Sequence, residues 1–281
     1  MTALWSDDAS LAPYRNVRDA DLRGSHNLFL VESPRCVARF LRACRHGTWQ
    51  PVSVLLAPEH VASLVPLAEA VQCPIVQGSM EDIALHSGYR FHHGALALGV
   101  HQTGQPLAQL LAVHHADQGC IVVADGVVHV DNIGSLFRNV ACLGASAVVL
   151  GPGCADPLGR KCIRISMGRV FGVPFACVPD SLTAVKQLQE AGWTCTAVEQ
   201  SASATPLHAW RPALRNAIVV GAEGRGVGAE ILNACDTCVE IESSLDPLAA
   251  EGEGPPSLNV STALAIVLHE LRRHGGNSLA S

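Results

Sequence analysis

Hydrophobic and polar residues follow one another along this chain in blocks that predict strands separated by helices. Short apolar runs rich in β-branched residues, such as Val52–Leu56 and Ile121–Ala124, predict buried strands. Between such runs, apolar residues recur at intervals of three and four, as in Ser135–Leu143, which predicts amphipathic helices. This alternation of strand and helix is typical of an α/β fold with a mostly parallel sheet.

The predicted elements form two series, separated at Gln102–Pro106 by a stretch of linker composition. In the first series we predict strands at 28–31, 52–56, 74–76 and 94–100, and helices at 34–43, 59–71 and 80–87. In the second we predict strands at 121–124, 146–150, 174–178, 194–198, 217–221 and 238–241, and helices at 135–143, 161–167, 182–191, 229–234 and 259–274. We therefore expect a smaller α/β domain over residues 1–105 and a larger one over 106–281.

The composition provides ample core material and indicates a cytoplasmic protein. Hydrophobic residues make up 48% of the chain and charged residues only 16%, yet no apolar run reaches membrane-spanning length. The polar start is unlike a signal peptide, and 11 scattered cysteines are typical of buried thiols in a reducing cytosol. The lone pair Cys235-x-x-Cys238 lacks a second half, so we expect it to pack in the core and expect no metal site.

The net charge of −6 is unevenly distributed, with two basic zones in an acidic chain. Residues 1–50 contain seven arginines against five acids. Residues 138–170 contain five Lys or Arg residues, and Asp156 is the only acid there. Local basic zones suit a protein that contacts phosphates at one site, although solvated helix faces would give the same pattern.

Three stretches carry candidate chemistry. In 130–144, Asn132 and Gly134 predict a turn, followed by a helix that bears Arg138 and ends at Gly144. This arrangement suits the binding of an anion, unless Arg138 only lies on the helix surface. In 218–228, a strand runs into four glycines that let the backbone approach a ligand, but the spacing matches neither a dinucleotide fingerprint nor a P-loop. In 256–263, Ser257 and Asn259 either cap the last helix or hold a ligand hydroxyl.

Taken in order, these stretches resemble the three motifs of the SpoU (TrmH-like) class of SPOUT RNA 2′-O-ribose methyltransferases. The matching residues are D125-G126, D131-N132-I133-G134, R138 and G144, then V220-G221-A222-E223-G224-R225-G226, then S257-L258-N259-V260-S261. Residues 1–105 resemble, more loosely, the L30e-like RNA substrate-binding domain that is often joined to this class, with Leu28–Glu32 at the expected place.

The resemblance implies a C-terminal SPOUT α/β domain with a deep trefoil knot, S-adenosyl-L-methionine as the cofactor, and a homodimer with its site at the subunit interface. It implies that the methyl donor is held mainly through backbone groups of three residues: Gly221, Ile241 and Leu258. It also implies that five side chains line the reacting centre: Asn132, Arg138, Glu223, Ser257 and Asn259. The L30e-like domain favours rRNA over tRNA as the partner.

The chain departs from the family pattern in one place, and the role of its arginine needs a chemical argument. The family usually has Ile-Pro-Met after the strand that ends at Ile241, whereas this chain continues with Glu242-Ser243-Ser244 and a longer, acidic connection to Ser257. Because a guanidinium stays protonated at neutral pH and is therefore a poor base, we expect Arg138 to act as an electrostatic clamp while the proton passes to phosphate or water. An RNA-binding module that has lost methyl transfer, or an α/β enzyme acting on another small substrate, are the alternatives.

Overall fold

The computed structural model describes residues 14, 19–81, 93–113, 118–243 and 256–275. The chain divides into two compact units. The first unit contains Met1–Gln102 and Asp156–Gly172, and the second contains Thr103–Ala155 and Val173–Ser281. The segment Asp156–Gly172 therefore packs with the first unit, although the residues before and after it in the sequence belong to the second. We call it the exchanged segment; the expected division at residue 105 did not include it.

The first unit is built on a four-stranded mixed sheet with the strand order β1-β4-β2-β3. Its elements are α1 (Asp19–His26), β1 (Leu28–Glu32), α2 (Pro34–Cys44), β2 (Pro51–Leu56), α3 (Pro58–Glu69), β3 (Ile75–Gln77), β4 (Ala95–Val100), α7 (Arg160–Ile165) and the 3-10 helix η2 (Arg169–Gly172). Strand β4 runs antiparallel to both β1 and β2, and only β2 and β3 are parallel.

The expectation of a mostly parallel sheet is therefore wrong for the first unit. Alternation of strands and helices indicates how the chain is layered, but it leaves open the direction in which the last strand enters the sheet. Here β4 inserts between β1 and β2 and opposes both. The helix expected over residues 80–87 falls mainly outside the described residues.

The second unit is built on a seven-stranded sheet, with the order β7-β6-β5-β10-β8-β11-β9, in which every neighbouring pair is parallel. The strands are β5 (Gly119–Ala124), β6 (Ala147–Leu150), β7 (Phe175–Cys177), β8 (Thr194–Val198), β9 (Thr205–Pro206), β10 (Arg215–Val220) and β11 (Thr237–Glu240). The helices are α5 (Leu107–Val113), α6 (Val130–Leu143), α8 (Ser181–Glu190), the 3-10 helix η3 (Leu207–Ala209), α9 (Ala229–Ala234) and α10 (Val260–Gly275). This confirms the α/β prediction for the C-terminal part.

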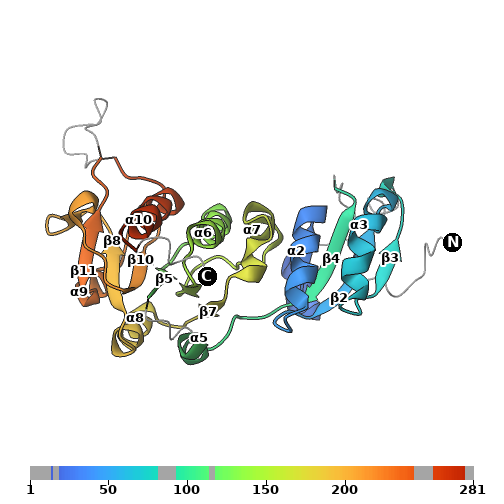
Figure 1. Ribbon diagram of the computed structural model, residues 1–281, viewed down its shortest axis with the longest axis horizontal. Helices are drawn as coiled ribbons and strands as arrows, with labels where there is room; N and C mark the ends of the chain where they lie inside the picture. Colours follow the sequence, from blue (N-terminus) through green and yellow to red (C-terminus); the bar gives the residue numbers. More distant parts are fainter. Residues whose placement is uncertain (1–13, 15–18, 82–92, 114–117, 244–255, 276–281) are drawn as a thin grey trace. The chain divides into compact units, whose positions relative to one another are not determined.

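Both faces of the parallel sheet are covered, which explains why its strands are nearly continuous apolar runs. Helices α5, α8 and α9 contribute Leu110, Leu188 and Ile231 to one buried cluster with strand residues such as Ile121 and Val219. Figure 1 draws α6 and α10 together on the opposite side of the sheet from α5 and α8. The Asn139 side chain on α6 donates a hydrogen bond of 2.7 Å to the Ser261 carbonyl on α10.

The predicted turn at Asn132 and Gly134 is wrong, because helix α6 begins at Val130 and includes both residues. The chain instead turns earlier, where Gly126 adopts φ 64° before the helix N-cap at His129. The predicted end of this helix is confirmed, since Gly144 adopts φ 85° at the C-cap. Among the described residues, no helix has the length and apolar character needed to cross a membrane.

Candidate functional site

The three motif stretches converge because the strands that precede them are parallel neighbours. Strands β5, β10, β8 and β11 lie side by side, so their carboxyl ends meet at one edge of the sheet. Asp125, Glu199 and Gly221 directly follow β5, β8 and β10 at this edge, and Ile241 directly follows β11. In open α/β sheets this edge is where ligands bind.

One amide joins all three motifs. The Asn259 Nδ2 group donates to Asn132 Oδ1 at 2.9 Å and to Glu223 Oε1 at 2.6 Å. Asn132 comes from α6, Glu223 from the loop after β10, and Asn259 from the residue before α10. We call Asn132, Glu223 and Asn259 the amide–carboxylate cluster; it brings together three residues that the sequence predicted to share one site.

Asn259 uses its whole hydrogen-bonding capacity within the protein. Besides the two bonds donated by Nδ2, its Oδ1 accepts from the Ser261 backbone N–H at 2.9 Å and from the Ser261 hydroxyl at 2.6 Å. The bond from the Ser261 N–H caps α10, so the capping prediction for Asn259 is confirmed. With both hydrogens and both lone-pair positions committed, Asn259 ties α6, α10 and the glycine loop together.

His129 extends this cluster and was missed by the sequence analysis. Its Nε2 lies 3.6 Å from Glu223 Oε2, and its side chain is 64% exposed. His129 precedes α6, outside the residues that carry the family resemblance, so only its position one residue before the Val130–Gly144 stretch could have drawn attention to it.

Arg138 lies apart from the amide–carboxylate cluster. It is exposed on α6, six residues after the buried Asn132, which at about 100° per residue turns it onto a different face of the helix. Among the described residues, Arg138 has no hydrogen-bond or ion-pair partner. A single chain therefore presents this guanidinium to its surroundings instead of joining it to Asn132, Glu223 or Asn259.

The glycine-rich loop after β10 folds back on itself, and two of its glycines are sterically required. A Cβ on Gly221 would lie 2.1 Å from the backbone carbon of Gly226. Gly226 adopts φ 69°, and a Cβ there would lie 2.1 Å from Glu199 Oε2. The Glu199 carboxylate accepts from the Val227 N–H at 2.8 Å and from the Gln200 N–H at 3.0 Å, so it holds the loop against the end of β8.

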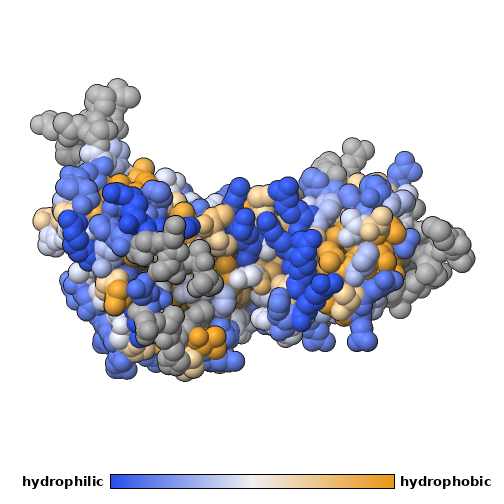
Figure 2. Space-filling view, in the orientation of Figure 1, coloured by the Kyte–Doolittle hydropathy of each residue, from blue (hydrophilic) through white to orange (hydrophobic). Residues whose placement is uncertain are grey.

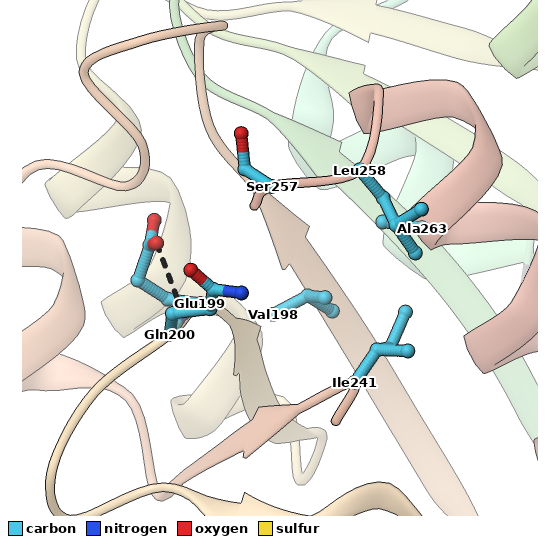
Figure 3. A pocket seen from close by; sticks show the side chains of 7 residues that line it. All are labelled: Val198, Glu199, Gln200, Ile241, Ser257, Leu258 and Ala263. Carbon is cyan, nitrogen blue, oxygen red and sulfur yellow. Dashed lines mark hydrogen bonds between the residues drawn. The ribbon is translucent and has the colours of Figure 1, made fainter. Parts of the chain in front are cut away.

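A hollow lies beside this loop, where β8 and β11 end and α10 begins (Figure 3). The space within it and in front of it, open solvent included, is about 440 Å³. Its lining consists of apolar side chains with a few polar ones: Val198, Glu199, Gln200, Ile241, Ser257, Leu258 and Ala263. Mixed linings of this kind are typical of small-molecule sites.

The hollow includes some of the predicted cofactor contacts and adds others. Ile241 and Leu258 line it, together with Ser257, which was predicted to lie at the reacting centre. Gly221 is absent from its lining and lies where the glycine loop closes. Glu199 and Gln200 were missed, because nothing in the strand Thr194–Val198 marks the residues that follow it. The altered connection after Ile241 lies mostly outside the described residues, in 244–255.

The described residues include no group of three or more His, Cys, Asp or Glu side chains that could hold a metal ion. Cys235 and Cys238 are free, partly buried thiols. Burial raises the pKa of Cys235 to about 12, and Cys238 Sγ donates to the Glu199 carbonyl at 3.6 Å. Both features suit side chains that pack against neighbours, as predicted.

Sequence comparison finds a family match over most of the second unit's sequence. Residues 119–269 match the SpoU rRNA methylase family. A protein of Mycobacterium tuberculosis H37Rv described as an uncharacterized tRNA/rRNA methyltransferase is 32% identical over 276 residues, covering 96% of this chain and 90% of the relative. The 23S rRNA (guanosine(2553)-2′-O)-methyltransferase RlmP of Bacillus subtilis is 32% identical over 173 residues, covering 58% of this chain and 64% of the relative.

Solved structures share the fold over nearly the whole chain. An rRNA methyltransferase from Sinorhizobium meliloti, crystallised with AdoMet bound, superposes with a TM-score of 0.77 at 20% identity, covering 95% of both chains. The SpoU methyltransferase AviRb from Streptomyces viridochromogenes gives a TM-score of 0.76 at 17% identity, covering 95% of this chain and 96% of that one.

Proposed function

This chain belongs to the SpoU rRNA methylase family, and from that membership we propose that it transfers a methyl group from S-adenosylmethionine to a ribose 2′-hydroxyl of RNA. Its reaction is RNA methylation. One observation carries the proposal for the site: residues of all three motifs meet at Asn259, one position after Leu258 in the wall of the hollow. The B. subtilis relative, named for 2′-O methylation in 23S rRNA, supports a ribose hydroxyl as the target.

The hollow fits the cofactor chemically. S-adenosylmethionine supplies a methyl group on a positively charged sulfur, which is already an activated electrophile. The apolar walls from Val198, Ile241 and Leu258 suit its base, and the hydroxyl of Ser257 and the amide of Gln200 suit its polar groups. Glu199 places a carboxylate in the same lining, which favours a ligand that carries positive charge.

The reaction then needs alignment and charge stabilisation from this chain's own residues. Alignment of the two reacting groups contributes several kcal/mol. Arg138 stabilises negative charge that develops on the ribose oxygen and pins a neighbouring phosphate, while the hydroxyl proton passes to phosphate or water. Asn132, Glu223 and Asn259 act as positioning residues, because their mutual bonds hold α6, the glycine loop and α10 together.

The position of Arg138 supports a homodimer. Its guanidinium is exposed and has no partner among the described residues of its own chain, which supports a reacting centre completed at a subunit interface. We propose this assembly, the trefoil knot and a cytoplasmic location together with the activity. We favour rRNA over tRNA as the substrate, because the family and its B. subtilis member are named for rRNA.

Substitution of Arg138 tests the proposal. Arg138→Ala should abolish transfer to RNA while the affinity for S-adenosylmethionine, measured by calorimetry, changes less than about twofold, because Arg138 is outside the hollow's lining. Arg272→Ala, a loss of the same charge from α10, serves as the control. Collapse of donor binding with surviving transfer would refute the role given to Arg138.

An RNA-binding module that has lost transfer is the second candidate. It is favoured by the sequence after Ile241, where Glu242-Ser243-Ser244 replaces the family's Pro-Met. Titration of the wild-type protein with S-adenosylmethionine separates the two functions, since the module gives no heat of binding. Mapping of ribose methylation in cells with and without the protein then identifies the nucleotide.

A further inference from the structure

The fold brings part of one basic zone of the sequence together with part of the other. Residues 33–50 and 157–172 contain eight of the chain's 19 Lys and Arg residues and neither Asp nor Glu. They are more than 100 residues apart in the sequence, but both belong to the first unit. In a chain whose net charge is −6, this is a strong local concentration of positive charge.

Helix α2 presents its charges opposite to its core face. Arg35, Arg39 and Arg42 are spaced by four and three residues, so they form one stripe along the helix. The buried residues of α2 lie on the other side: Cys36, Val37, Phe40, Leu41 and Cys44. Arg35 and Arg42 are exposed. Figure 2 draws a deep-blue, hydrophilic band on the surface over this helix.

The segment 157–172 docks on the flank of this stripe through specific contacts. The Arg39 guanidinium donates to the Met167 carbonyl, and Cys36 Sγ donates to the Ile163 carbonyl at 3.8 Å. Gly168, at φ 73°, approaches α2 so closely that an added Cβ would lie 3.1 Å from the Cys36 Cα. Helix α7 thus lies beside α2, as Figure 1 draws it.

An aromatic anchor fixes this docking. The Phe171 ring centroid lies 5.0 Å from that of Phe40, 5.7 Å from that of Phe29 and 5.4 Å from that of Trp49. Trp49 Nε1 also donates to the Phe171 carbonyl at 2.9 Å. The segment is therefore part of the core of the first unit, and its exposed Lys161 and Arg164 have a fixed position relative to α2.

The carboxylates that directly precede these two segments in the sequence are Glu32 and Asp156. Glu32 is only 3% exposed. Asp156 is paired with Arg23 and lies 3.0 Å from His101 Nε2. The exposed side chains of α2 and α7 are all cations: Arg35, Arg42, Lys161 and Arg164.

We propose that α2 and α7 together form one phosphate-binding surface for the RNA substrate. This rests on the proposed function and says which part of the protein holds the RNA. Guanidinium and ammonium groups on two adjacent helices that contain no Asp or Glu suit the regularly spaced phosphates of a nucleic-acid backbone. Such contacts position RNA without reading its sequence.

The test compares three double variants of the full-length protein by fluorescence anisotropy with a labelled 40-nucleotide mixed-sequence RNA hairpin. The first is Arg35→Gln with Arg42→Gln, the second Lys161→Gln with Arg164→Gln. The third, Lys186→Gln with Arg273→Gln on α8 and α10, is a control with the same loss of charge. Each of the first two should weaken binding about tenfold and reduce the slope of log affinity against log salt by about 1.8, the loss of two phosphate contacts.

Several outcomes overturn the proposal. If the control weakens binding as much as the other variants, net charge and not this surface binds the RNA. If only the α2 variant loses affinity, α7 has no part in the surface. Calorimetry with S-adenosylmethionine and thermal melting on the same proteins report the hollow and the fold, so failed methyl transfer with intact RNA binding would count against the proposed function alone.

Discussion

Asn259 is the single side chain on which the geometry of the candidate site depends most. Asn259→Ala removes the cap of α10, worth about 1 kcal/mol. It also leaves the 6% exposed Asn132 without its hydrogen-bond donor, worth about 1–3 kcal/mol. We expect the free energy of unfolding to fall by about 2–4 kcal/mol in urea titrations. Ser203→Ala, in an exposed turn, should change it by less than about 0.5 kcal/mol, and an equal loss in both would contradict the role of Asn259.

Ser33 holds a backbone conformation that normally belongs to glycine. It adopts φ 87° and ψ 145° at the N-cap of α2, where its side chain accepts from the Cys36 N–H at 3.4 Å. Relief of this backbone strain stabilises the folded protein by about 1–3 kcal/mol. Against this, loss of the side-chain cap costs a few tenths of a kcal/mol, and the greater freedom of glycine in the unfolded chain costs about 0.5–1 kcal/mol. Ser33→Gly should therefore raise the free energy of unfolding by about 1 kcal/mol. Ser33→Ala keeps the strain and should lower the free energy of unfolding. An alanine variant that is more stable than the glycine variant would contradict this account.

At the scale of elements, the loop after β10 is constrained by close approach as well as by backbone conformation. Gly226→Ala would push a Cβ into Glu199 and demand a left-handed residue, so we expect a loss of about 2–4 kcal/mol in unfolding free energy. Affinity for S-adenosylmethionine should also fall, because Glu199 lines the hollow.

Gly224 offers a matched control within the same loop. It adopts φ 78°, yet a Cβ there would meet nothing within 4 Å. Gly224→Ala should therefore incur only the backbone cost, about 1–2 kcal/mol. Denaturant titration of both variants isolates the contact with Glu199, and equal losses would rule that contact out as the cause.

At the scale of the whole molecule, Phe171 attaches the exchanged segment to the first unit. Phe171→Ala removes the ring that packs against Phe29, Phe40 and Trp49, which costs about 3–5 kcal/mol in a well-packed core. We expect amide hydrogen exchange to accelerate in α7 and RNA affinity to fall, while exchange in β5 of the second unit is unchanged. Unaltered exchange in α7 would show that the segment is held by other contacts.

Local sequence signals predicted helices and strands well where tertiary packing favoured the same structure. They failed where contacts with distant residues favoured a different one. The helix end at Gly144 was predictable from glycine's left-handed preference. The start of α6 was not, because Asn132 and Gly134 favour turns locally but are buried against the rest of the fold as helical residues. The two-residue strand β9 and the short helix α5 were missed, since segments of two and seven residues carry too little periodicity.

The sequence by itself determined the α/β class, the positions along the chain of six of the seven strands in the second unit's sheet, and the identity of the residues in the three motifs. These depend on hydrophobic period and residue type, which are written locally in the chain. Only the tertiary structure decided that β4 runs antiparallel, that residues 156–172 pack with the first unit, and that Arg138 stands apart from Asn132, Glu223 and Asn259. These features arise from contacts between residues distant in sequence, and local patterns contain no information about such contacts.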